Sequence, residues 1–319
     1  MRATIVTPSP RGSRHGNRVT ALRWAAVLRH LGARVRIVER WRGEPCDLLV
    51  AVHAVKSADS VLAAAAALPA LRVVVLLAGT DVYPTFAPSP AALAALQRAD
   101  AIVALQPFAI EVLPPPLRSK ARTIVQSATA RPAARPREPF VACVLAHLRP
   151  VKDPLLVVRA LAAVPRTLPL RVVLAGEARA PELAAAARAA AAAEPRFRWL
   201  GPLPRRRALE LLAGSHACIV PSAAEGGANV VSEAIAAGTP VLATAVPGNL
   251  GLLGSDWPAT FAVDDALGLA ALLQRAATDA DFRTLLAERT RALQPLVAPA
   301  REVAAWRRLL ADLGLPASV

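Results

Sequence analysis

The 319-residue sequence is poor in aromatic side chains, in cysteine and in long apolar runs. Aromatic residues make up only 4% of the chain, so it lacks the stacking side chains that nucleic-acid-binding surfaces combine with basic ones. The three cysteines, at positions 46, 143 and 218, have no C-x-x-C spacing, and the five histidines are scattered. We therefore predict no metal site, and we expect Cys143 and Cys218, which lie in apolar runs, to be core residues.

No segment has the apolar length that a membrane span needs. The nearest candidate, "VLAAAAALPALRVVVLLAG" (61–79), is interrupted by Pro69 and Arg72, whereas a spanning helix needs about eighteen or more apolar residues. The start, "MRATIVTPSP", lacks the long apolar core of a signal peptide. The sequence thus predicts a cytoplasmic protein that does not contact a membrane.

Acidic residues are also few, at 23 against 38 basic ones, which gives a formal charge of +15. Such a balance favours anionic partners. The arginines are spread along the chain rather than gathered in one basic stripe, so small anionic substrates explain the charge better than nucleic acid does. A basic nucleic-acid-binding protein is the least favoured alternative.

What the chain does have is a regular alternation of short apolar runs and helical segments. This alternation predicts parallel sheets with helices on both faces, and the length suffices for two cores. A segment rich in Pro and Arg, 128–139, interrupts the alternation and is predicted to be a linker. We therefore expect an α/β protein with two Rossmann-like, doubly wound domains facing a cleft: 1–130 and 138–298, with a helix in 299–315 packing back on the first. The expected strands are 3–8, 34–39, 47–53, 72–81 and 101–106, then 140–148, 170–177, 196–201, 217–222 and 240–246.

The stretch "PSAAEGGANVVSEAIAAGTPVLA" (221–243) places two carboxylates around the start of a helix. A strand ends near Ser222 and the helix runs to a glycine cap at Gly238, which leaves free amides and a positive dipole end at the helix start. Two glycines there remove side chains that would keep a diphosphate away, and the carboxylates could accept hydrogen bonds from hydroxyls. The alternative is an exposed loop with solvated glutamates. The residues concerned are Glu225, Gly226, Gly227, Ala228, Asn229, Val230 and Glu233.

The pattern "PSxxEGxxxxxxxEAxAxGxPV" resembles the glutamate-pair signature of the retaining, family-4 glycosyltransferases of the GT-B fold. The resemblance implies that Glu225 contacts the donor sugar and Glu233 the nucleotide ribose. It further implies that Lys152, in "LAHLRPVKDP", neutralises the departing nucleoside diphosphate, so that no metal cofactor is needed.

The chain also departs from that pattern. His147 stands where the family usually has Arg, and we expect Arg149 to supply the lost charge at the donor site. Gly201, in "RWLGPLP", is expected to lie against the nucleotide base, and "VPGNLGLLG" (246–254) replaces the usual Gly-Gly followed by Glu. The expected catalytic residues are Lys152, Glu225 and His147.

A narrower resemblance, carried by segments along nearly the whole chain, is to the selenosugar synthases of selenoneine biosynthesis. It implies that selenophosphate attacks the anomeric carbon of UDP-glucose or UDP-N-acetylglucosamine, that UDP leaves, and that loss of phosphate gives a 1-seleno sugar. Retention is the family default, but direct attack by selenium could invert the anomeric carbon. A family-4 O-glycosyltransferase with another small acceptor is the main alternative. The segments include "PSPRGSRHGNRVTALRWAAVLRHLG", "AGTDVY" and "GNLGLLG".

A basic loop after the first strand suits such an acceptor. Three arginines and two glycines there precede a helix, a combination that favours a small, highly charged oxyanion, and Asn17 is the expected N-cap. Asp81, at the end of another strand, is expected to face the same acceptor. The alternative is a basic surface loop in an Arg-rich protein. The expected acceptor-binding residues are Arg11, Gly12, Arg14, Gly16, Asn17, Arg18 and Asp81.

Overall fold

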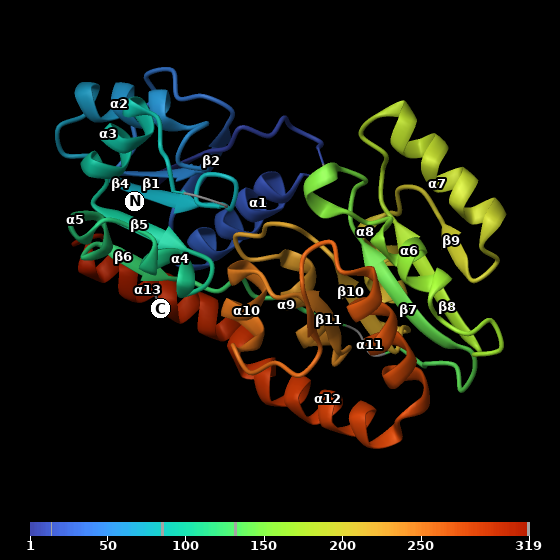
Figure 1. The fold of residues 1–319 in the computed structure, drawn as a ribbon. Coiled ribbons are helices and arrows are strands. Elements are labelled where there is room, and N and C mark those ends of the chain that lie inside the picture. The colour runs from blue at the N-terminus through green and yellow to red at the C-terminus, as the bar shows by residue number, and fades with distance from the viewer. Residues whose placement is uncertain (14, 84–85, 131–132, 318–319) are drawn as a thin grey trace. The chain divides into compact units, whose positions relative to one another are not determined.

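The computed structural model describes residues 1–13, 15–83, 86–130 and 133–317 (Figure 1). The chain divides into two compact units, unit 1 (Met1–Gln126 and Pro299–Val319) and unit 2 (Ser127–Ala298). Each unit contains one six-stranded sheet whose strands are all parallel. The prediction of two doubly wound α/β units is therefore confirmed.

The sheet of unit 1 has the strand order β2-β1-β3-β4-β5-β6. Two central strands, β3 and β5, are apolar and buried along their whole length, as expected where helices cover both faces of a parallel sheet. The short edge strand β6, which has only one buried residue, was not predicted. The bounds are β1 (Arg2–Val6), β2 (Arg34–Val38), β3 (Leu48–Val52), β4 (Arg72–Leu77), β5 (Ala101–Ala104) and β6 (Ala121–Thr123).

A helix from the end of the chain completes the core of unit 1. Trp24 packs edge-on against Trp306, with ring centroids 4.8 Å apart and an interplanar angle of 74°. The indole Nε1 of Trp24 donates to Glu302 Oε1 at 2.9 Å, so that the buried N–H is satisfied. The helices of unit 1 are α1 (Gly16–His30), α2 (Ala58–Ala67), α3 (Pro90–Arg98), α4 (Phe108–Glu111), α5 (Pro115–Arg118) and α13 (Pro299–Asp312).

The start of α1 corrects one prediction. The N-cap residue is His15, in extended conformation, and Asn17 already lies in the first helical turn. The helix begins there because the carbonyl of His15 accepts the amides of Arg18 and Val19, which is the bond pattern of the first turn. Asn17 is therefore not the cap.

The sheet of unit 2 has the order β12-β11-β10-β7-β8-β9. The two-residue strand β12 was not predicted, because so short a segment carries no periodicity. The strands are β7 (Phe140–Leu145), β8 (Leu170–Ala175), β9 (Phe197–Trp199), β10 (Ala217–Val220), β11 (Val241–Thr244) and β12 (Thr260–Phe261). The helices are η1 (Pro150–Lys152), α6 (Leu156–Ala162), α7 (Pro181–Ala193), α8 (Arg205–Ala213), α9 (Asn229–Ala237), α10 (Pro247–Leu253), α11 (Ala266–Thr278), α12 (Ala280–Leu293) and η2 (Gln294–Val297).

The described part of the segment predicted to be a linker, 128–130 and 133–139, does not stand apart from the two units. It belongs to unit 2, where the Arg135 guanidinium donates to the carbonyls of Ala213 at 3.2 Å and Gly238 at 2.8 Å. Both carbonyls lie at helix ends, where the last carbonyl groups have no partner within the helix. Arg135 thus anchors this segment to the ends of α8 and α9, although the arginine-rich composition of the segment is typical of a linker.

The cysteine prediction is confirmed. Cys143 and Cys218 are fully buried and form no disulfide, and they are direct neighbours in the register of β7 and β10. Both are core residues of the sheet.

Each sheet has a point at which the strand order reverses. In unit 1 the reversal lies between β1 and β3, and in unit 2 it lies between β7 and β10. In doubly wound sheets, ligands bind at the carboxyl ends of the strands beside this point, because the helices that follow the two strands lie on opposite faces. The fold therefore directs attention to the loops after these four strands.

Candidate active site

The loops after β7 and β10 bring together two of the predicted catalytic residues. Lys152 Nζ lies 2.5 Å from Glu225 Oε1, although 73 residues separate them in the chain. The Lys152 side chain is 22% exposed and that of Glu225 only 8%. The amide of Ala223 also donates to the carbonyl of Val151 at 2.9 Å, which joins the two loops through their backbones. A partly open ion pair therefore lies at the reversal point of unit 2.

A glycine that the sequence analysis did not single out holds Glu225 in place. A Cβ atom on Gly248 would lie 1.9 Å from the carbonyl oxygen of Glu225, so only glycine permits this approach of α10 to the loop. Gly176, after β8, is required in the same way by the carbonyl of Ala146. Both glycines were visible in the strand-end patterns "VPGN" and "LAGE", but the backbone that approaches them was not.

The start of α9 presents amides without acceptors. The N-cap residue Ala228 supplies no side-chain acceptor. Within the described part of the chain, the amides of Gly226, Gly227 and Val230 donate to no other group. Gly227 has a φ of 151°, which L side chains rarely adopt. Free donors at the positive end of a nine-residue helix can bind an anion.

Glu233, the second predicted carboxylate, lies inside α9 with its side chain 9% exposed. Its Oε1 is 2.8 Å from Nη2 of Arg205, the first residue of α8. The distance is that of an ion pair, yet Oε1 is buried and receives no aligned hydrogen bond. Arg205 was not predicted, since nothing in the run "PRRRAL" distinguishes it from the two arginines that follow it.

The remaining predicted donor residues line the neighbouring strand ends. His147 Nδ1 accepts the amide of Glu177 at 3.2 Å, whereas Arg149 is exposed and forms no ion pair with any described residue. Gly201 has a φ of 66°, and no atom lies within 4 Å of where its Cβ would be. The space over Gly201 is therefore open, as contact with a planar base would require. That contact, like the catalytic role of His147 and the donor contact of Arg149, stays a prediction.

In unit 1, the predicted basic loop follows β1 at the reversal point. Gly12, with a φ of 83°, faces open space. Arg11 is exposed, Arg18 is half-buried, and neither forms an ion pair with a described residue; Arg14 lies outside the described residues. The amides of Gly16 and Asn17 have no acceptor in the described part of the chain.

Two buried hydroxyls in this loop had no sequence signal. The Oγ1 atom of Thr7 and the Oγ atom of Ser13 have no hydrogen-bond partner among the residues that the structure describes. Buried polar atoms are normally satisfied, so these two are donors that an oxyanion could use.

Asp81 is not open to a ligand, contrary to the prediction that it contacts the acceptor. Its side chain has no exposed surface, and its two oxygens accept the amides of Ala54, Ala78 and Gly79 at 2.7–3.1 Å. The carboxylate satisfies donors of two strand-end loops, so it positions backbone in this structure.

His53, beside Asp81, takes a strained backbone conformation. Its φ is 77°, uncommon for a non-glycine residue, and its Nε2 lies 3.1 Å from Thr80 Oγ1. Burial lowers the pKa of the imidazole; the nearby Asp81 carboxylate raises that pKa and Lys56 lowers it. Burial outweighs the Asp81 carboxylate, so the pKa of this imidazole at the carboxyl edge of β3 lies below its ordinary value.

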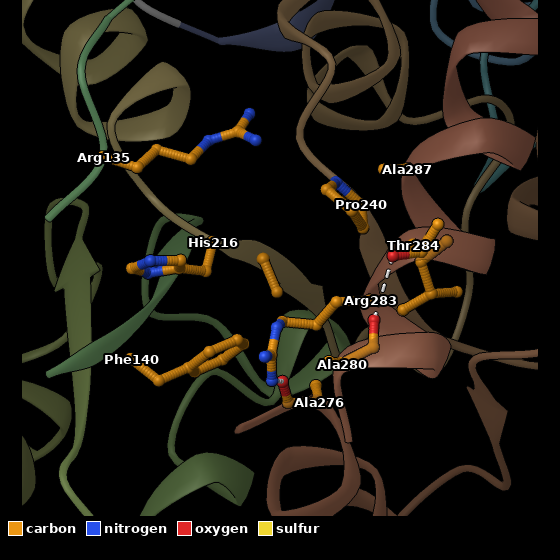
Figure 2. A pocket seen from close by; sticks show the side chains of 11 residues that line it. Arg135, Phe140, His216, Pro240, Ala276, Ala280, Arg283, Thr284 and Ala287 are labelled. Atoms are coloured by element: carbon orange, nitrogen blue, oxygen red, sulfur yellow. Dashed lines mark hydrogen bonds between the residues drawn. The ribbon is translucent and has the colours of Figure 1, made fainter. Parts of the chain in front are cut away.

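A hollow of about 320 Å³ lies at the amino-terminal ends of strands β7 and β10 in unit 2, away from the carboxyl ends where Lys152 and Glu225 lie (Figure 2). Phe140 and Ala217, the first residues of β7 and β10, line it together with Arg135, His216 and Arg283. The two arginines donate to carbonyls at the ends of α8 and α11, so their charges are used to cap helices. We therefore do not place the active site there.

The sequence predicts neither a metal site nor a membrane-spanning helix, and both features were sought among the described residues. Among them, no three His, Cys, Asp or Glu side chains are arranged to hold a metal ion. No described helix combines the length and the apolarity that crossing a bilayer requires.

A family profile described as "Glycosyl transferases group 1" matches residues 126–292, more than half of the chain. The chain belongs to this family. The matched region contains the Lys152–Glu225 pair, the start of α9 and Glu233, so the glycosyltransferase signature coincides with the site that the fold indicates. No curated protein matches the chain by sequence.

Solved structures confirm the GT-B fold of this glycosyltransferase. The chain is similar to HepE (Alr3699) from Anabaena in complex with UDP, with a TM-score of 0.77 and 16% identity over 98% of this chain and 99% of that one. It is similar to the sucrose-phosphate synthase of Thermosynechococcus elongatus, with a TM-score of 0.80 and 16% identity over 98% of both chains. A glycosyltransferase from Rickettsia africae gives a TM-score of 0.77 at 13% identity over 98% of both chains. At such identities the likeness concerns the fold.

Proposed function

We propose that this glycosyltransferase uses a UDP-sugar, bound by unit 2, as its donor. The observation that carries the proposal is the Lys152–Glu225 pair at the reversal point, next to the acceptor-free amides at the start of α9. An ammonium and free amides suit a diphosphate, and a carboxylate suits sugar hydroxyls. The similar fold of HepE, solved with UDP and with UDP-glucose, supports the choice of nucleotide.

The proposed roles of the donor residues combine the family resemblance with their places in unit 2. Lys152 stabilises the charge that develops on the leaving diphosphate, Glu225 orients the sugar, and Glu233 accepts hydrogen bonds from the ribose. His147 and Arg149, on the loop between β7 and η1, lie on the same strand end as Lys152 and complete the site. The amides at the start of α9 supply the remaining donors without a metal ion.

We further propose that the acceptor is selenophosphate and that the basic loop after β1 binds it. Its support is the narrow sequence resemblance, together with Arg11 and Arg18, which form no ion pair with a described residue, and the amides and hydroxyls there that have no described partner. Selenium donates an electron pair to the anomeric carbon while the carbon–oxygen bond to UDP breaks, and UDP takes that bond's electron pair. Water then splits the selenium–phosphorus bond: its hydroxyl goes to phosphorus, which leaves as phosphate, and its proton goes to selenium, which gives the 1-seleno sugar. We propose that the enzyme works in the cytoplasm.

The experiment is mass spectrometry of the products formed from UDP-glucose or UDP-N-acetylglucosamine with selenophosphate. We expect UDP, phosphate and a hexose that carries one selenium atom. Because either anomer could form, the coupling constant of the anomeric proton is measured on the same product. UDP release that needs another small acceptor instead would identify an O-glycosyltransferase, and no UDP release with any sugar donor would overturn the donor assignment.

A further inference from the structure

Arg205 and Glu233 form an ion pair of unequal partners in unit 2. The Glu233 side chain is 9% exposed, whereas that of Arg205 is 55% exposed. Nη2 of Arg205 lies 2.8 Å from Oε1 of Glu233, but none of its N–H groups is aligned with that oxygen, which also has no solvent-exposed surface. The guanidinium therefore covers the carboxylate oxygen without satisfying it.

We propose that Arg205 is a displaceable cover on Glu233, which the nucleotide ribose pushes aside when the donor binds. This inference rests on the proposed function, in which Glu233 accepts hydrogen bonds from ribose hydroxyls. It adds that the guanidinium of Arg205 lies beside Glu233 before the donor binds, so that the ribose must compete with Arg205 for the carboxylate.

The energetics favour such an exchange. A carboxylate buried without a partner is costly, so the donor-free protein needs a cation beside Glu233. A hydroxyl can approach Oε1 along a straight hydrogen bond, which the guanidinium does not achieve here. Moving Arg205 costs little, because a half-exposed ion pair is screened and the long side chain returns its charge to water.

The lysine pair in the same site has the same asymmetry. Lys152 is the more exposed partner and Glu225 the buried one, and Lys152 also exchanges its carboxylate for a ligand when a diphosphate arrives. The donor-free site is thus held by two internal ion pairs. Arg206 differs, because it pairs with the exposed Glu210 on its own helix and offers a matched control.

The experiment is calorimetry of UDP binding to the whole protein and to an Arg205→Met variant, which keeps the length of the side chain but removes the cation. We expect Arg205→Met to bind UDP about two- to fivefold more tightly, the range that corresponds to loss of an exposed ion pair. Arg205→Lys should bind like the wild type, and Arg206→Met should not differ from it. In a Glu233→Gln background, where no carboxylate is left to cover, Arg205→Met should have no effect.

Each other result overturns the proposal in a recognisable way. Weaker UDP binding by Arg205→Met would mean that Arg205 contacts the nucleotide. Unchanged binding, or tighter binding that persists with Glu233→Gln, would mean that the pair does not compete with the ribose. Failure of the wild-type protein to bind UDP would overturn the proposed donor together with this inference, so the two failures are distinguishable.

Discussion

The loop after β10 in unit 2 and the loop after β1 in unit 1 are built alike and charged differently. Both follow a strand at a reversal point, contain glycine with positive φ, and lead into a helix. Near the helix start some amides have no acceptor among the described residues, namely Gly226, Gly227 and Val230 in unit 2, and Gly16 and Asn17 in unit 1. In unit 2 the charged side chains at the loop and helix are carboxylates, each facing a cation within 2.8 Å. In unit 1 they are arginines, and neither of the two that are described is paired.

The difference indicates what each loop is prepared to bind. In unit 2 each charged side chain of the loop and helix already has an internal partner, and these ion pairs can be replaced by contacts to a ligand that has both hydroxyls and phosphates, such as a nucleotide sugar. A loop with uncompensated cations favours a compact anion. The same strand-loop-helix element thus serves two chemistries through its side chains.

The largest effect should come from removing the Lys152 ammonium, the cation beside Glu225 in unit 2. Lys152→Ala should lower the turnover number at least about 100-fold, because charge on the leaving diphosphate then has no counter-charge. EDTA should leave the wild-type rate unchanged, since no metal takes part. Steady-state UDP release measures both. Activity that is lost with EDTA and restored by Mg²⁺ or Mn²⁺ would contradict the role of Lys152.

The two carboxylates of unit 2 should separate binding from turnover. Glu233→Ala should weaken UDP binding by roughly 1.5–3 kcal/mol, because charge-assisted hydrogen bonds to the ribose are lost. Glu225→Ala should lower turnover with the sugar donor and leave UDP affinity nearly intact. Calorimetry with UDP, together with initial rates, distinguishes them. The assignment is wrong if Glu233→Ala binds UDP as the wild type does.

The cations of unit 1 should act on the acceptor alone. Arg18→Ala should lower kcat/KM for selenophosphate by about tenfold, or roughly 1–2 kcal/mol. This lies below the cost of a fully buried arginine because Arg18 is only half-buried. Inorganic phosphate should compete with selenophosphate, and less well in the variant. Unchanged kinetics would make the loop an ordinary basic surface.

The smallest effect concerns the buried histidine that supports the carboxyl edge of unit 1. Burial lowers the pKa of His53 below its ordinary value of 6.5. As the pH falls below 6.5, the folded protein then binds fewer protons at His53 than the unfolded protein does. The contribution of neutral His53 to the free energy of unfolding is therefore complete above pH 6.5 and is lost as the pH falls toward the folded-state pKa. His53→Asn, which tolerates positive φ, should show a smaller loss of Tm between about pH 7.5 and about pH 5. If Tm falls equally in the wild type and in His53→Asn, protonation of His53 does not contribute to the loss of stability in acid.

The sequence predicted those parts of the fold and site that depend on local pattern. Ten of the described strands and the start of α9 follow from apolar runs, glycines and a polar loop, although the edge strand β2 has no buried residue. The edge strands β6 and β12 could not be found this way, because β12 has only two residues and β6 (ART) lacks the large apolar side chains that the equally short β9 (FRW) has.

Other features could not be predicted because they depend on contacts between distant segments. Gly248 is required by the backbone of Glu225, which lies on another loop. Arg205 is one of three consecutive arginines, and only the packing of α8 beside α9 selects it as the partner of Glu233. Asp81 ends the predicted strand 72–81, where an open ligand could lie, but β4 ends at Leu77 and amides of two loops enclose the Asp81 carboxylate.

The central claim is that unit 2 binds the donor and unit 1 binds the acceptor. It is tested most directly by measuring UDP affinity and the KM for selenophosphate in two variants, Glu233→Ala and Arg18→Ala. We predict a crossed result: Glu233→Ala weakens UDP binding and leaves the KM for selenophosphate unchanged, whereas Arg18→Ala raises that KM and leaves UDP binding unchanged. If Arg18→Ala weakens UDP binding as much as Glu233→Ala does, or if neither variant changes either constant, the division between the two loops is contradicted.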